Sequence, residues 1–414
     1  MTGVDAELIR RAAILYATRK PASLLYAMGI TQHAHGTENV MATANLAMLT
    51  GNVGKPGTGV NPLRGQNNVQ GACDMGALPN VFSGYQAVTD GDIRQKFKTA
   101  WEVDYLPPDA GLTLPDMFRA IDRGQIKAVY MVGENVAVSE PDLNNVRTSL
   151  EKLEFLVVQD IFLTESTPYA NVVLPAASFA EKEGTFTNTE RRVQWLNQIV
   201  PPPGEARPDW WIVSRIAAKM GGKGFDYRSA GEILSEINKV TPSYAGITPE
   251  RLKSASFQWP CVNEDHGGTP ILHTYAFSRG KGHFEPLSNR GPVEVPDESY
   301  PLVLTTARSL YHYHTGTMTR KVSGLNTMRD KEFIEVNPVD AIPLGIKNLE
   351  NVRVISRRGS VKTKALLSDK TPAGVVTMDF HFAESPVNMI TNAVHDPLSK
   401  IPEYKACAVR IERI

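Results

Sequence analysis

The chain has 414 residues, which is enough for roughly two to four domains. Hydrophobic residues make up 42% of it and charged residues 21%, as in ordinary globular proteins, and 44 basic side chains balance 44 acidic ones, which argues against nucleic-acid binding. The sequence has no apolar run of about 18 residues and no signal-peptide pattern, so we expect no membrane span and a cytoplasmic location.

The first 71 residues are expected to form a helix, a strand, a second helix and a loop. The N-terminal stretch has the spacing of an amphipathic helix, with apolar residues at Leu8, Ile9, Ala12, Ile14 and Leu15. Ser23–Gly29 is a short apolar run that predicts a strand, and Asn39–Thr50 has the composition of a helix. Gly51–Gly71 is dense in Gly, Asn and Pro, which predicts a long loop, and such loops are often functional.

The middle of the chain alternates apolar runs with helical segments. The runs are Ala128–Asn135, Phe155–Phe162 and Asn171–Pro175, and Asp142–Lys152 is the helix between the first two. This pattern predicts a parallel sheet covered on both faces.

The last part of the chain has a different pattern. Asp209–Met220 is expected to be a helix in a mixed region. After Glu294 come six short strands that predict a β-barrel: Leu302–Thr306, Phe333–Asn337, Val352–Ser356, Ser360–Leu367, Val375–Phe380 and Cys407–Glu412. The three cysteines are far apart, so we expect buried apolar residues and no disulfide framework.

Polar residues follow two of the apolar runs. They are Gly133, Glu134, Asn135 and Ser139 after the first run, and Asp160 and Thr164 at the second. In doubly wound sheets ligands bind at the carboxyl ends of strands, and an Asp can accept hydrogen bonds from a guanine. From these residues alone, turn and helix-cap chemistry is the favoured alternative.

Two further segments could hold a ligand. The loop carries Arg64, whose planar fork matches a carboxylate, beside Gly65, Gln66 and Asn68; the alternative is a solvated surface loop. Residues 305–321 carry Arg308, His312, His314 and Thr315 around a Thr-Gly-Thr turn, where phosphates or a pterin could bind. Two histidines at this spacing make a poor zinc site, and structural histidines in a turn are the main alternative.

Taken together these segments resemble the molybdopterin oxidoreductase family, and within it the catalytic subunits of formate dehydrogenases. The resemblance rests on strings that span the chain in the family's order: MGITQHAHGTENV (28–40), RGQNNVQGACDMG (64–76), VYMVGEN (129–135), VVQDIFLTES (157–166), LPAASFAEKEGTFTNTERRVQ (174–194), ARSLYHYHTGTMTR (307–320) and PEYKACAVRIE (402–412).

The resemblance implies a function and site residues. Formate would be oxidised to carbon dioxide at a Mo or W ion held by two molybdopterin guanine dinucleotides, with Arg64 binding the formate carboxylate. The implied cofactor-binding residues are Gly65, Gln66, Asn68, Gly133, Glu134, Asn135, Ser139, Asp160 as the guanine reader, Thr164, Arg308, His312, His314, Thr315, Asn388 and Lys405.

The resemblance also implies a domain plan. Residues 1–66 would be the C-terminal part of a discontinuous α/β domain, 67–178 an α/β domain that binds a guanine dinucleotide, 179–293 a mixed connecting region, and 294–414 a six-stranded barrel that binds molybdopterin dinucleotide. The fold class expected is therefore α/β, with parts of two doubly wound domains plus the barrel.

Several residues of the family's catalytic subunits have no counterpart here. The cysteine motif for a [4Fe–4S] cluster and the cysteine or selenocysteine that ligates the metal are missing, and no residue of this chain is expected to be a metal ligand. We therefore expect a missing N-terminal segment or partner chain, an electron-transfer subunit carrying iron–sulfur, flavin or hydrogenase groups, and no activity from the isolated chain. Two alternatives are a non-catalytic scaffold subunit of a redox complex and another oxidoreductase of the family, such as a nitrate reductase.

Overall fold

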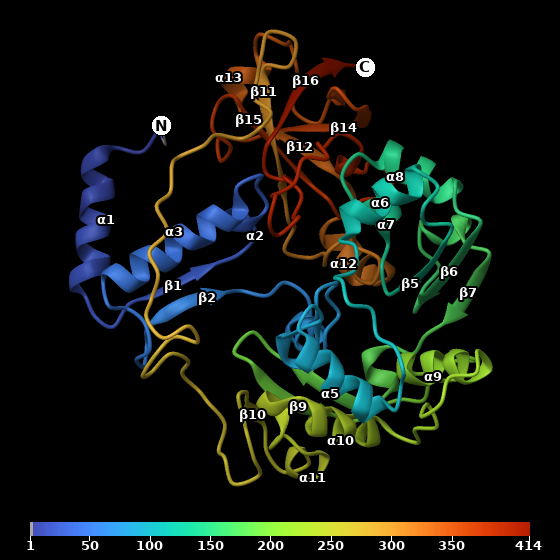
Figure 1. The fold of residues 1–414 in the computed structure, drawn as a ribbon. Helices are drawn as coiled ribbons and strands as arrows, with labels where there is room; N and C mark the ends of the chain where they lie inside the picture. The colour runs from blue at the N-terminus through green and yellow to red at the C-terminus, as the bar shows by residue number, and fades with distance from the viewer. Residues whose placement is uncertain (1–2) are drawn as a thin grey trace.

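The computed structural model describes residues 3–414. Its parts are arranged in a ring: an N-terminal unit, a parallel sheet, a mixed region beneath them, and a C-terminal barrel that lies between the first two (Figure 1). Among the described residues, no helix is both long and apolar enough to cross a bilayer. The division at residues 66, 178 and 293 stays a prediction.

The N-terminal unit contains the predicted strand and helices. Its elements are α1 (Ala6–Thr18), β1 (Ser23–Tyr26), α2 (Met28–Thr31), α3 (Gly36–Leu49) and β2 (Gly59–Pro62). Asp5 caps α1 by accepting hydrogen bonds from the backbone N–H groups of Glu7 and Leu8. No residue of α1 is buried, so its apolar stripe faces solvent in this chain.

The expectation of a loop through Gly51–Gly71 is wrong at β2 and at the start of α4 (Val69–Asp74). β2 pairs in parallel with β1, from Ser23 opposite Gly59 to Tyr26 opposite Pro62. Local composition hid this strand because its hydrogen-bond partner lies 36 residues earlier in the chain and Gly, Asn and Pro are poor strand formers.

The predicted parallel sheet is confirmed, with the order β5 (Ala128–Val132), β6 (Phe155–Asp160) and β7 (Val172–Pro175). Helices α6 (Leu114–Asp122), α7 (Val136–Ser139) and α8 (Leu143–Glu151) contribute, with the strands, to one apolar core. On the other face Tyr130 and Val132 remain 40% and 44% exposed. The expected cover on both faces is therefore incomplete within this chain.

The mixed region is built on an antiparallel sheet with the order β10 (Phe257–Gln258), β9 (Arg192–Leu196) and β8 (Gly184–Thr187). Around it lie α5 (Gly91–Trp101), α9 (Asp209–Lys219), α10 (Ala230–Val240), α11 (Pro249–Leu252) and the short hairpin β3 (Val81–Phe82) and β4 (Gln86–Ala87). The predicted helix at 209–220 is thus confirmed. Cys261 is buried in this core, whereas Cys73 is only half-buried.

The predicted six-stranded barrel is confirmed and closed. Its strands are β11 (Leu302–Ala307), β12 (Phe333–Val336), β13 (Asn351–Ile355), β14 (Ser360–Leu367), β15 (Val375–Asp379) and β16 (Cys407–Arg413), in the order β11-β15-β12-β14-β13-β16. Burial alternates strictly along β11, so Leu302 and Leu304 fill the interior while the residues between them face outward.

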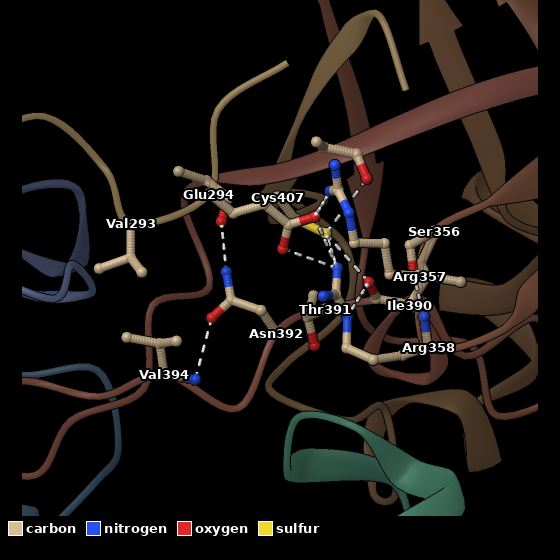
Figure 2. A network of polar contacts seen from close by, with 12 residues as sticks. Val293, Glu294, Ser356, Arg357, Arg358, Ile390, Thr391, Asn392, Val394 and Cys407 are labelled. Carbon is tan, nitrogen blue, oxygen red and sulfur yellow. Dashed lines mark hydrogen bonds and ion pairs between the residues drawn. The ribbon is translucent and has the colours of Figure 1, made fainter. Parts of the chain in front are cut away.

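An extended segment, residues 262–301, runs from the mixed region past α3 to the barrel (Figure 1). Arg358 of the barrel binds the C-terminal part of this segment. The Arg358 guanidinium donates to the Glu294 carboxylate at 2.9 Å and to the Cys407 sulfur at 2.9 Å (Figure 2). Arg357 pairs with the same Glu294 carboxylate at 2.5 Å. Two arginines on one nearly buried carboxylate hold the segment against the barrel.

The barrel core supports a first prediction. Leu304→Ala removes a side chain that is 0% exposed, so the free energy of unfolding should fall by about 2–5 kcal/mol. Urea-induced unfolding followed by a barrel-specific probe measures the change. Leu398→Ala, at a position 70% exposed, is the control and should cost less than about 0.5 kcal/mol. Equal effects at the two positions would contradict the packing described here.

Candidate functional site

Two cavities lie where the barrel meets the other units. Their volumes are about 580 and 640 Å³, within the usual range of ligand pockets. The first cavity is lined by barrel residues that include Thr306 and Arg308, and the second by the strand ends of the parallel sheet. Five residues line both cavities: Gly65, Gln66, Glu134, Tyr313 and His314.

The second cavity sits at the carboxyl ends of β5 and β6. Gly133, with a φ of +63°, turns the chain away from β5 and leaves the backbone open to the cavity. Asp160 ends β6, and its Oδ1 accepts hydrogen bonds from the backbone N–H groups of Ile161 at 2.7 Å and Phe162 at 3.3 Å. Burial raises the pKa of Asp160. Its second oxygen accepts no hydrogen bond among residues 3–414.

Asn135 braces the loops around this cavity. Its Oδ1 accepts from the backbone N–H of Ser166 at 3.1 Å and from the Ser166 hydroxyl at 2.9 Å, and its Nδ2 donates to Glu165 at 2.6 Å. A longer contact of 3.4 Å reaches Thr317 of the barrel. Asn135 therefore fixes the strand ends and the barrel loop relative to each other.

The barrel segment 307–320 presents charged and aromatic groups to both cavities. Arg308 stacks over Phe380 at 3.5 Å, and burial lowers the pKa of its guanidinium to about 10. His314 has a φ of +50° and packs edge-on against Phe380. Burial, and then the Arg308 charge, lower the pKa of His314 to about 4, so its ring is neutral at pH 7. Thr315 lines the second cavity.

His312 lines the first cavity, but both of its ring nitrogens have partners in the segment that connects β11 and β12. They contact the Arg329 carbonyl at 2.6 Å and the Thr319 hydroxyl at 3.3 Å. These contacts agree with the alternative stated in the sequence analysis, in which His312 is a structural histidine that is hydrogen-bonded in a turn.

Asn388, Tyr404 and Ser139 form the contact between barrel and sheet. The Asn388 amide donates to the carbonyls of Val138 and Ser139, both at 2.9 Å, and the Tyr404 hydroxyl donates to Ser139 at 2.9 Å. Lys405 donates to the Thr306 carbonyl, and burial lowers its pKa to about 8. Asn388 and Ser139 line the first cavity, so the contact also builds its wall.

Arg64 lies directly before the two glycine-loop residues that line both cavities. Its Nε donates to Gln70 at 3.0 Å, while its terminal nitrogens have no hydrogen-bond partner among residues 3–414. Asn68 lines neither cavity; its φ is +61° and its Oδ1 accepts from the Thr187 backbone at 2.9 Å. The adjacent Asn67 lines the second cavity instead.

Sequence reasoning missed several lining residues, among them Gln32, Glu140 and Tyr404. Glu140 is half-buried beside Glu134, and desolvation by the surrounding protein, followed by that charge, raises its pKa to about 7. Only the fold brings these residues to the cavity. The one local signal was the position of Glu140 directly after the strand-end string.

Some buried polar atoms without hydrogen-bond partners belong to residues in or near the cavities. Within residues 3–414 these atoms include Gln32 Oε1 and Thr306 Oγ1, which belong to residues of the first cavity, and Thr164 Oγ1 near the strand ends. Buried polar groups are nearly always hydrogen-bonded in complete proteins. A polar ligand with donors and acceptors along its length would therefore suit these cavities.

Comparisons with known proteins agree with this geometry. Residues 12–219 match the family described as "Molybdopterin oxidoreductase", and residues 302–408 match the "Molydopterin dinucleotide binding domain". The second match covers most of the barrel, including the segment that carries Arg308 and His314.

Similar proteins include formate dehydrogenases. The chain is 54% identical to the F420-dependent formate dehydrogenase subunit alpha of Methanocaldococcus jannaschii, over 100% of this chain and 61% of that protein. It is 39% identical to formate dehydrogenase H of Escherichia coli, over 100% of this chain and 59% of that protein. The chain thus spans about three fifths of the length of these relatives.

Acetylene hydratase from Pelobacter acetylenicus has a similar solved structure. The TM-score is 0.71 at 17% identity, covering 100% of this chain and 63% of that one. At this identity the likeness concerns the fold alone.

Glu140 gives the site a pH dependence that can be measured. The Glu140 carboxyl has a pKa of about 7 in the folded protein and 4.5 in the unfolded chain. Between these two pH values the folded protein binds more protons than the unfolded chain, so the free energy of unfolding falls as pH rises from about 4.5 to 7. Glu140→Gln should therefore gain stability relative to wild type across this window.

The comparison is the difference in melting temperature between the cofactor-free variant and wild type from pH 4.5 to 8. A difference is needed because His314 has the opposite sign: its lowered pKa gives stability that is lost as pH falls from about 6.5 to 4. If the difference in melting temperature does not change with pH, the raised pKa of Glu140 is refuted.

Proposed function

The chain belongs to the molybdopterin oxidoreductase family, and we propose that it is part of the catalytic subunit of a formate dehydrogenase that oxidises formate to carbon dioxide. One observation carries the proposal. Arg64 directs an unpaired guanidinium fork from the loop whose next two residues line both cavities. A planar, permanently charged fork matches the two oxygens of formate.

The cavities suit two molybdopterin guanine dinucleotides. In the second, the free oxygen of Asp160 and the open backbone at Gly133 match the donors of a guanine and the approach of a phosphate. In the first, Arg308 and the unpaired Gln32 and Thr306 oxygens match the charged and polar parts of such a group. When bound, the pterins would hold the Mo or W ion that takes up two electrons.

The residues of this chain would bind and orient. Arg64 would hold the formate carboxylate and offset its charge, which is a positioning and electrostatic role. Neutral His314 and Thr315 would hydrogen-bond the pterins from the barrel side. Asn135, Ser139 and Asn388 would set the distance between sheet and barrel, through the contacts described above. Lys405, which donates to the Thr306 carbonyl within the barrel, would add a cation beside Arg308.

A further polypeptide segment would supply the metal ligand and the [4Fe–4S] cluster. Two apolar surfaces support this part of the proposal: the exposed stripe of α1 and the open face of the β5–β7 sheet. An electron-transfer subunit would then accept the electrons. The relative from Methanocaldococcus jannaschii is named F420-dependent, so a subunit that passes the electrons to F420 is one candidate.

The role of Arg64 is tested by Arg64→Ala in the complete, cofactor-loaded enzyme. Losing the fork should raise the KM for formate about 100-fold and lower kcat, and Arg64→Lys should lie between because lysine cannot bind bidentately. Arg123→Ala is the matched control, since Arg123 also donates through Nε to a glutamine, Gln125, but lies outside the loop that contributes Gly65 and Gln66 to both cavities. An unchanged KM in Arg64→Ala would remove Arg64 from the site.

The guanine assignment is tested by Asp160→Asn. One of the two acceptor oxygens becomes a donor that faces the guanine donors, so dinucleotide affinity should fall about tenfold or more. The measurement is guanine nucleotide released by acid per mole of protein, after dialysis of the loaded enzyme. Equal retention by variant and wild type would show that Asp160 does not read the guanine.

A further inference from the structure

Behind Arg64 lies a carboxylate that is completely shielded from solvent. Asp74 at the end of α4 is 0% exposed and accepts four hydrogen bonds. Its Oδ1 accepts from Gln70 Nε2 and the Tyr85 hydroxyl, both at 2.8 Å, and its Oδ2 accepts from the Tyr244 hydroxyl at 2.6 Å and Trp259 Nε1 at 2.7 Å. These four short bonds place donors at both oxygens of the ionised form.

The donors come from distant parts of the sequence. Tyr244 and Trp259 lie 170 and 185 residues after Asp74 and belong to the mixed region. Burial, and then the Asp74 charge, raise the pKa values of Tyr85 and Tyr244, so both hydroxyls keep the protons they donate. The four hydrogen-bond donors to Asp74 are therefore all neutral groups.

Asp74 determines which way the Gln70 amide faces. An ionised carboxylate can only accept, so Gln70 must direct its NH₂ group toward Asp74. Its oxygen then faces the opposite side, where Arg64 Nε, which can only donate, contacts it at 3.0 Å. The order of donors and acceptors from Asp74 through Gln70 to Arg64 has a single consistent solution.

We propose that Asp74 is a positioning residue for formate binding, which orients the Gln70 amide and thereby fixes the Arg64 fork. The inference rests on the proposed role of Arg64 as the formate-binding residue. Asp74 touches no substrate and acts through Gln70. We call the hydrogen-bonded series Asp74–Gln70–Arg64 the relay; its direction, meaning which group donates to which, is set by the ionised Asp74 because that carboxylate can only accept.

Asp74→Asn should reverse the relay while keeping its shape. The new NH₂ group avoids Trp259, which can only donate, and so faces the Gln70 side. Gln70 must then flip, which places its own NH₂ group against Arg64 Nε. Two donors face each other, and the Arg64 fork loses its anchor.

The test uses the complete enzyme and four variants. In Asp74→Asn and Gln70→Met the KM for formate and the inhibition constant of nitrate, a planar oxyanion, should each rise about tenfold or more. Trp259→Phe removes an equally short bond to the same carboxylate on the side away from Arg64. It should lower the melting temperature with a much smaller change in both constants.

The fourth variant exchanges the partners. In Asp74→Asn with Gln70→Glu, the Asn amide donates to a Glu carboxylate that accepts from Arg64, so the direction of the relay is restored and both constants should recover toward wild type. No recovery, or equal KM changes in Trp259→Phe and Asp74→Asn, would overturn the inference and leave Asp74 a packing residue. An effect of Arg64→Ala without any effect of Gln70→Met would likewise overturn it, whereas failure of Arg64→Ala would reject the proposed function itself.

Discussion

The contact between the barrel and the parallel sheet is the constraint on which the site depends. Asn388 and Tyr404 of the barrel donate to the carbonyls of Val138 and Ser139, at the end of the segment that follows β5. Those carbonyls belong to α7, a helix too short to satisfy its own carbonyl groups, so the partner surface must satisfy them. Without this contact the strand ends and the barrel loop would not face a common space.

The contact between the barrel and the sheet also determines which charged side chains surround the first cavity. Arg308 from the barrel lines the same cavity as Glu134 and Glu140 from the sheet side, and Lys405 lies near Arg308. Burial weakens the charged form of each group, as the lowered pKa of Lys405 and the raised pKa of Glu140 indicate. Such a site favours a ligand that brings its own negative charges, as the pyrophosphate of a dinucleotide would.

Local patterns in the sequence were sufficient to predict the strands that bury one face or both faces. The six barrel strands and the three strands of the parallel sheet lie within a few residues of their predicted positions, because alternation and apolar runs report burial directly. β2 was missed because its pairing with β1 is non-local, and the open face of the sheet could not be foreseen because covering elements carry no signal in the strand itself.

The candidate residues divide in the same way. Among the residues that the resemblance implies, Gly133, Asp160 and His314 line a cavity, and Arg64 lies directly before two residues that do. Asn68 is occupied with a backbone contact instead. Asp74 lies within the string RGQNNVQGACDMG and Glu140 directly follows Ser139, but the sequence alone singles out neither residue. Their importance arises from burial and from partners up to 185 residues away, which only the tertiary structure supplies.

The five residues that line both cavities also link the two thermodynamically. Gly65, Gln66, Glu134, Tyr313 and His314 line both cavities, so a ligand in either one would contact them and reduce their conformational freedom. The first ligand therefore bears most of that entropy loss, and the second binds to walls already ordered. Loading should be positively cooperative, so that half-filled molecules are scarce and the protein passes from empty to fully loaded over a narrow range of ligand concentration.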